Sequence, residues 1–212
     1  MSRLPLLLLS LAGLAELATA QTATDLLAHA RASIASMNGS FDGAFMQGSG
    51  RNRVPFVVES NRTGAMRYHF NNPGEIVSIL VGQAPEGDLT RSVRGTDVTL
   101  EDLSLWYLQW PAGNVRQENS AGMAFWVVSV TNDTGKGSYA KADVWIHQSS
   151  LALFRVDALD KNNAVVRRLE VEHIREFGDQ KIADRLRVST FQQGNKVSST
   201  YVQLARERER TE

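Results

Sequence analysis

Apolar and polar residues alternate with a period of two over most of this chain, in short runs that Gly, Asn and Pro separate. This period is typical of strands, and turn clusters such as Asn71-Asn72-Pro73-Gly74 between the runs indicate antiparallel hairpins. The sequence therefore predicts a mostly-β fold of about ten strands, at residues 40–47, 54–60, 64–71, 75–81, 123–131, 139–148, 151–159, 165–175, 181–191 and 196–206.

One segment near the N-terminal end has a helical period instead. Residues 24–37 carry a single apolar stripe, with Thr24 as the expected N-cap and Asn38-Gly39 at the end of the helix. A helix with one apolar stripe is expected to lie against the sheet.

Residues 100–110 form a second, shorter candidate helix. Thr99 is placed to cap it, Asp102 follows at the capping-box position, and Pro111 ends it. One face of this short helix carries a heavy load of large side chains, which are Leu103, Trp106, Tyr107 and Trp110. The predicted fold class is therefore α+β, mostly β, with an N-terminal helix and a short aromatic helix.

Residues 1–20 have the composition of a secretory signal peptide. Arg3 precedes an apolar run, and Ala18-Thr19-Ala20 reads as a small-x-small cleavage site. The apolar run is shorter than the roughly 20 residues that cross a bilayer, so a membrane-spanning segment is not expected. We expect export, cleavage after Ala20 and a single mature domain over residues 21–212.

The net charge bears on the binding partners of the chain, and the cysteine content bears on its cross-links. Lys and Arg number 23 and Asp and Glu number 23, so a neutral chain offers no electrostatic basis for binding nucleic acid. The chain has no cysteine, so it has neither disulfides nor a cysteine for a lipid anchor. The fold is expected to depend on its apolar core alone.

No catalytic constellation is recognised in the sequence. The four histidines are scattered without metal-ligand spacing, so no metal site is expected. Asp133-Thr134-Gly135 matches a short signature of aspartic proteases, but Thr131-Asn132 stand where two apolar residues are needed, which favours a hairpin loop. The expectation is a protein without a cofactor that is not an enzyme.

The aromatic residues carry the first hint of function. Residues 123–130 are apolar on both faces, and a strand of that kind needs cover on both sides, from a core, a second layer or an apolar ligand. Ordinary core packing is one interpretation of the large side chains. The other is a lined apolar cavity, with candidate lining residues Leu103, Trp106, Trp110, Phe125, Trp126, Trp145, Phe56 and Phe70.

The chain resembles the periplasmic outer-membrane lipoprotein-sorting family, the LolA/LolB-like carriers. The resemblance rests on residues 99–106, on 139–146 and on 153–157, with Asp160 and 167–169, and it spans nearly the whole mature chain. It implies an unclosed antiparallel half-barrel that covers the helices and holds an apolar cavity. It also implies a periplasmic carrier whose cargo is acylated lipoprotein or lipid, with an inner-membrane donor complex and an outer-membrane acceptor.

Two functions follow from these observations. The first is a non-enzymatic periplasmic carrier that binds acyl chains in the half-barrel for transfer to the outer membrane. The alternative is a periplasmic protein-interaction subunit of an envelope export system, whose core is dry and filled by its own side chains.

Overall fold

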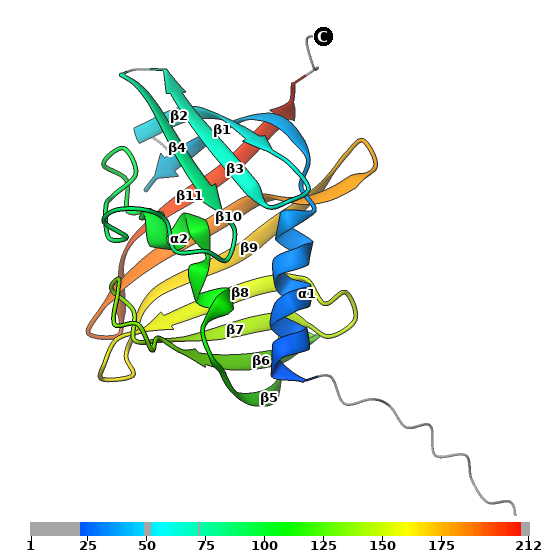
Figure 1. Cartoon of the computed structure of the whole chain (residues 1–212), viewed down its shortest axis with the longest axis vertical. Coiled ribbons are helices and arrows are strands. Elements are labelled where there is room, and N and C mark those ends of the chain that lie inside the picture. Colours follow the sequence, from blue (N-terminus) through cyan, green and yellow to red (C-terminus); the bar gives the residue numbers. More distant parts are fainter. Residues whose placement is uncertain (1–21, 49–51, 72, 209–212) are drawn as a thin grey trace, which may run out of the picture.

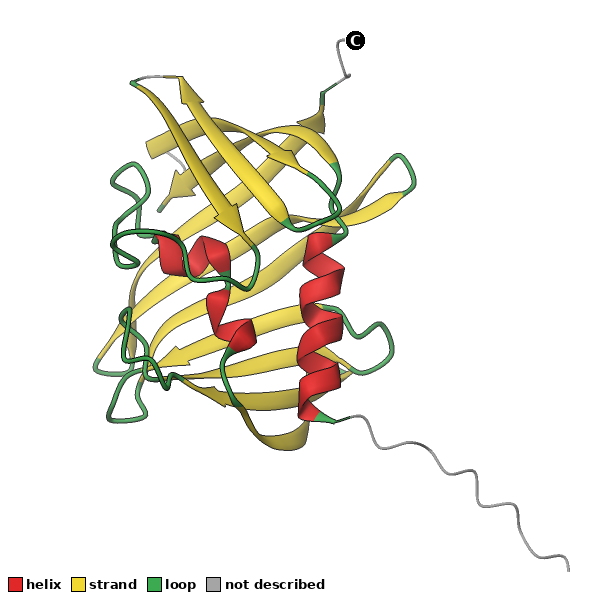
Figure 2. Ribbon diagram, viewed as in Figure 1, coloured by secondary structure: helices red, strands yellow, loops and turns green. Residues whose placement is uncertain are grey.

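In a computed structural model, which describes residues 22–48, 52–71 and 73–208, the chain forms one antiparallel sheet with helices on one face (Figures 1 and 2). The predicted signal peptide and its cleavage site lie outside the described residues. The eleven strands are β1 (Gly39–Gln47), β2 (Asn52–Ser60), β3 (Ala65–Asn71), β4 (Gly74–Leu80), β5 (Ala112–Ser120), β6 (Met123–Thr131), β7 (Lys141–His147), β8 (Leu153–Leu159), β9 (Val165–Phe177), β10 (Gln180–Gln192) and β11 (Asn195–Glu207).

The sheet consists of two meanders that are joined where the last strand returns to the first. Its order is β4-β3-β2-β1-β11-β10-β9-β8-β7-β6-β5, so β1 pairs with β11 and every other neighbour is consecutive in sequence. β4 and β5 are the two edges and do not pair with each other, which leaves the curved sheet unclosed. The predicted mostly-β half-barrel is therefore confirmed, with eleven strands in place of about ten.

The strand missing from the sequence analysis is β5. Its residues are mostly polar and almost all exposed, and it pairs only with β6, from Ser120 opposite Met123 to Ala112 opposite Val130. An edge strand with little apolar surface has no period-two pattern, so hydrophobic alternation does not detect it.

The N-terminal helix α1 (Ala23–Ala35) packs across the concave side of β5–β8 (Figure 1). Its apolar stripe is buried through Leu26, Leu27 and Ala30. The cap is Thr22, not Thr24, because the Thr22 hydroxyl accepts the N–H of Asp25 at 3.1 Å and Asp25 completes a capping box. The helix therefore begins earlier than predicted.

The second predicted helix is divided into two pieces. α2 (Leu100–Ser104) begins at the expected cap, Thr99, and a 3₁₀ helix, η1 (Trp106–Gln109), follows. Leu105 between them has φ 51° and ψ 33°, a left-handed conformation that ends the α-helix. The prediction of one helix over 100–110 is wrong at this residue. Residues 99–110 are called the lid below.

One apolar core fills the space between the sheet and the helices. At the β1–β3 end, four aromatic rings pack together, with centroids 4.9 to 6.3 Å apart: Phe45, Phe56, Tyr68 and Phe70. At the β6–β8 end, the core is aliphatic and faces α1 and the lid. Val128, Val144 and Ile146 are fully buried there.

Candidate functional site

The lid crosses the concave side of the sheet between β4 and β5 without contributing a strand to it (Figure 2). Its N-terminal end is fixed by a capping box, in which the Thr99 N–H donates to the Asp102 carboxylate at 2.9 Å. In return, the Asp102 N–H donates to the Thr99 hydroxyl at 3.2 Å. The box uses Asp102 Oδ2, which leaves Asp102 Oδ1 free to accept a further hydrogen bond.

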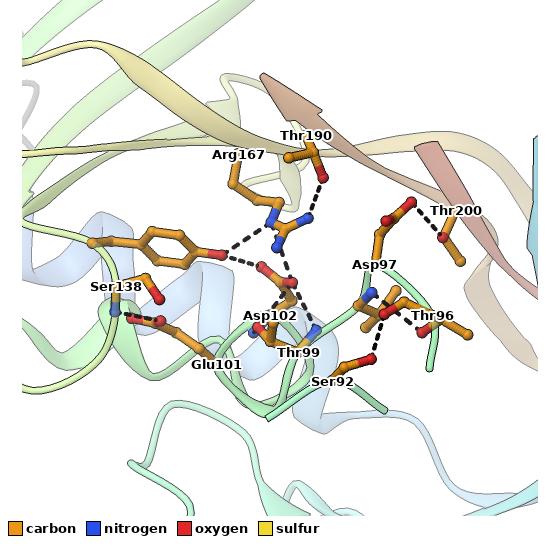
Figure 3. A network of polar contacts seen from close by, with 12 residues as sticks. Ser92, Thr96, Asp97, Thr99, Glu101, Asp102, Ser138, Arg167, Thr190 and Thr200 are labelled. Carbon is orange, nitrogen blue, oxygen red and sulfur yellow. Dashed lines mark hydrogen bonds and ion pairs between the residues drawn. The ribbon is translucent and has the colours of Figure 1, made fainter. Parts of the chain in front are cut away.

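A buried polar network joins the lid to β9 and β10 (Figure 3). The Tyr139 hydroxyl donates to Asp102 Oδ1 at 2.7 Å, and Arg167 Nε donates to the same hydroxyl at 3.1 Å. Arg167 Nε also lies 3.5 Å from Asp102 Oδ2, and its terminal nitrogen donates to the Thr190 hydroxyl. This largely buried charged pair links the lid to β9.

Strand alternation explains why Arg167 points inward. It shares the concave face of β9 with Leu169, and Thr190 lies directly opposite it on β10. Burial alone would lower the pKa of the Arg167 guanidinium, but the Asp102 carboxylate and the Tyr139 hydroxyl hold that pKa above its ordinary value. Arg167 therefore stays charged beneath the lid.

Glu101 is a second carboxylate in the network, and its side chain is fully buried. Its two oxygens accept the Ser138 backbone N–H at 2.9 Å and the Trp106 indole N–H at 3.3 Å. Burial raises the pKa of Glu101, although both donors oppose that shift. The Trp106 bond lies within the lid, whereas the Ser138 bond attaches the lid to residues 132–138, the loop that contains Asp133-Thr134-Gly135.

The geometry of that loop predicts an unequal effect of two alanine substitutions. Gly137 has φ +77°, and a Cβ there would collide with the Glu101 carboxylate, so we expect G137A to cost about 2 kcal/mol or more of unfolding free energy. Gly135 has φ +67° but no neighbour within 4 Å, so G135A is expected to cost only about 1 kcal/mol. Urea denaturation of both variants tests this, and equal losses would contradict a clamp on Glu101.

Six of the eight candidate lining residues lie in or against the concave core. Trp106 and Trp110 meet edge to face in the lid, with ring centroids 5.0 Å apart. The structure places the other four in the same core or packed against it: Phe56 and Phe70 are buried, and Leu103 and Trp126 are half-buried.

Phe125 and Trp145 do not lie with the other six. They belong to the convex face of the sheet, where their rings meet at 5.8 Å and the Arg155 guanidinium stacks on Trp145 at 4.4 Å. Side chains alternate along β6, so Phe125 and Trp126 point to opposite faces and cannot line the same cavity. Phe125 and Trp145 are therefore removed from the candidate lining, and the other six remain candidates.

Strand β6, which is apolar on both faces, is covered on both sides. Its concave face packs under the lid and α1, and its convex face carries a separate cluster in which Phe125 and Val127 are fully buried. Phe154 completes that cluster, with its ring 4.7 Å from Phe125. No second layer is needed there because neighbouring side chains of the same face provide the cover.

The network residues escaped the sequence analysis. Asp102 was expected only as part of a cap, and Arg167 only as part of a family pattern. A usable signal was present, because Arg167 stands two residues before the buried Leu169, on the same side of β9. A charged residue at an inward position needs a buried counter-charge, which the sequence alone does not locate.

Three further kinds of site concern the other described residues: a surface depression, a metal site and a membrane-spanning helix. A depression of about 630 Å³ opens at the tips of the β8–β9 and β10–β11 hairpins, lined by Phe191, Val197 and other residues, and none of the eight candidates lines it. Over the described ranges, no three His, Asp or Glu side chains are grouped to hold a metal ion. No helix within these ranges is long and apolar enough to cross a membrane.

Comparison with solved structures identifies the fold. A LolA superfamily protein from Nitrosomonas europaea superposes with a TM-score of 0.66 at 14% identity, covering 90% of this chain and 95% of that one. A putative outer membrane lipoprotein-sorting protein domain from Vibrio parahaemolyticus gives 0.63 at 13% identity, covering 88% and 93%. A DUF1329 family protein from Desulfovibrio piger gives 0.59 at 17% identity, covering 87% and 91%.

No curated protein matches the chain. A family model that is described as "-like: Uncharacterized protein" matches residues 80–209, which is more than half of the chain and includes the lid, its network and β5 to β11. The chain therefore belongs to that family, and its fold is the LolA-like half-barrel that the sequence resemblance predicted.

Proposed function

We propose that this protein is a non-enzymatic periplasmic carrier that binds the acyl chains of lipoproteins, or of free lipid, inside the half-barrel. The lid is the observation that carries the proposal. It buries Trp106 and Trp110 against the concave face, yet it contributes no strand to the sheet, and the side chains of Glu101 and Asp102 link it to Ser138 and Tyr139. Moving the lid would free apolar surface without breaking the sheet.

The energetics of acyl chains explain why such a carrier is needed. Each CH₂ group that leaves an apolar environment for water costs about 0.8 kcal/mol, so a chain of roughly 16 carbons costs on the order of 12 kcal/mol. A concave sheet whose lining is almost wholly apolar supplies the required environment. The lid aromatics and Trp126 would contact the acyl chain.

The fold relatives and the predicted signal peptide support a site of action in the periplasm. A LolA-like carrier there would receive its cargo from an inner-membrane donor complex and pass it to an outer-membrane acceptor. A neutral chain is consistent with this role, because the cargo is recognised by apolar contact and not by charge.

Native mass spectrometry, combined with lipid extraction, tests the proposal on the mature protein purified from an envelope fraction. We expect a mass increment from co-purified phospholipid or acylated peptide, which disappears after delipidation and returns on incubation with lipid. A clean apo mass that stays unchanged on incubation would contradict the carrier function.

Dense packing favours a second candidate function. Tyr107 and Leu108 of the lid are almost completely buried, and the lid as it stands fills the concave side with its own side chains. A protein-interaction subunit of an envelope export system would keep such a core dry. The same mass spectrum decides between the two, because a dry core takes up no lipid at any concentration.

A further inference from the structure

The two tryptophans of the lid differ in one respect. The Trp106 indole N–H donates to Glu101, whereas the Trp110 indole N–H is buried and has no acceptor within the part of the chain that the structure describes. Trp110 is only 4% exposed. A buried donor without a partner is costly, so it is rarely retained unless something else supplies the acceptor.

The neighbouring acceptors of the lid are already engaged. The Tyr107 carbonyl accepts the backbone N–H of Trp110 itself at 3.2 Å, and the Leu108 carbonyl accepts Arg31 at 3.4 Å. The Ser104 carbonyl accepts the N–H of Gly82 at 2.7 Å. A carbonyl can accept a second hydrogen bond, but none of the described residues accepts the Trp110 indole N–H, so its acceptor has to come from outside them.

We propose that the Trp110 indole N–H binds the carbonyl oxygen of an ester- or amide-linked acyl chain. This inference rests on the proposed function and specifies the class of ligand. Plain hydrocarbon offers no acceptor, whereas the linkage that joins an acyl chain to glycerol or to a protein offers a neutral one. The rings around Trp110 then contact the first carbons of the chain.

The charges near the lid favour a neutral carbonyl over a free carboxylate. Three carboxylates lie in or beside the network, those of Asp97, Glu101 and Asp102. Two guanidinium groups offset part of this charge, Arg167 in the network and Arg31 at the Leu108 carbonyl, so one negative charge remains in surplus. Trp106, which binds Glu101, packs directly on Trp110. An ionised fatty acid at Trp110 would add a negative charge to this surplus, at a cost that burial increases.

Three fluorescent probes test the proposal on delipidated mature protein. The methyl ester of parinaric acid has a neutral carbonyl, parinaric acid at pH 8 has a carboxylate, and diphenylhexatriene is a hydrocarbon. We expect W110F to weaken binding of the methyl ester about 3- to 10-fold, the range of one lost hydrogen bond, and to leave diphenylhexatriene binding unchanged. W145F is the matched control, since Trp145 also has an unpaired indole N–H but lies on the convex face.

Any outcome that differs from this expected pattern overturns the proposal. An equal loss for the ester and the hydrocarbon would mean that Trp110 acts only through packing. An unchanged affinity for the ester would mean that water or nothing pairs with the indole, and tighter wild-type binding of the acid would contradict a neutral carbonyl. If no probe binds the wild-type protein, the proposed function itself fails. The other outcomes overturn only the role of Trp110 and leave the proposed function intact.

A second measurement avoids dependence on a variant. In wild-type protein labelled with ¹⁵N-tryptophan, the Trp110 indole proton is expected to shift downfield when the methyl ester is added, and not when diphenylhexatriene is added. W110F is needed only to assign the signal, and the three other tryptophan signals can be assigned by elimination through their own substitutions. A Trp110 signal that responds equally to both probes would overturn the proposal.

Discussion

Replacing Arg167 with methionine is expected to lower the free energy of unfolding by about 3 kcal/mol. The substitution keeps most of the apolar stem but removes the cation beside Asp102, which is 2% exposed and would be left as a buried charge without a counter-charge. The loss falls at the low end for a broken buried pair because Tyr139 and Thr99 still donate to the carboxylate.

The neighbouring residue provides the control. Arg168 points to the convex face and binds Asp157, but Asp157 keeps a second partner in Arg155, and Arg168 itself is partly exposed. R168M is therefore expected to cost less than about 1 kcal/mol. Urea denaturation of both variants at neutral pH measures the difference between the inward and the outward arginine of one strand.

A double variant separates the ion pair from the packing. In R167M/D102N the uncompensated charge is gone, so we expect part of the lost stability to return and the two substitutions to be non-additive. If R167M and R168M are equally stable, or if D102N adds its full cost to R167M, the lid is not held by this pair and another contact must anchor it.

The strands were predictable from sequence because each buries one face. Ten of the eleven follow the period of two, with boundaries within a few residues of those expected. β5 was not predictable, because this edge strand forms through its pairing with β6 and its own residues carry no strand pattern. The left-handed conformation of Leu105 could not be predicted either, since no Gly or Asn stands at the position where α2 ends and η1 begins.

The site was only partly predictable for a related reason. Residue type identified the large aromatic side chains, but the face on which each one lies depends on register, and one step along β6 separates Trp126 from Phe125. The polar network joins residues from 99 to 190, and no spacing rule connects Asp102 to Tyr139, Arg167 and Thr190. Only the assembled sheet brings them together.

The strand face provides the sharpest test of the proposed cavity. Trp126 and Trp145 are both half-buried and lie on neighbouring strands, β6 and β7, but Trp126 packs against the concave core and Trp145 lies on the convex face. Under the proposed function, only Trp126 touches the acyl chain. The two residues therefore form a matched pair of the same type and similar exposure on opposite faces.

We expect W126Q to reduce uptake of diphenylhexatriene by more than about 10-fold, because the chain loses the apolar contact of a large aromatic side chain. W145Q is expected to bind the probe as the wild type does. Fluorescence titration of delipidated proteins gives the affinities, and circular dichroism confirms that both variants are folded.

A second polar substitution, at Trp106 of the lid, is expected to remove the uptake that remains in W126Q. Trp106 packs against the core opposite the sheet, so W106Q/W126Q is expected to abolish uptake altogether, at a cost in stability that the denaturation midpoint will report. A folded double variant that retains uptake would contradict the assignment of the cavity to the concave face. Equal losses in W126Q and W145Q would contradict it as well, because a ligand inside the half-barrel cannot reach the convex side of the sheet.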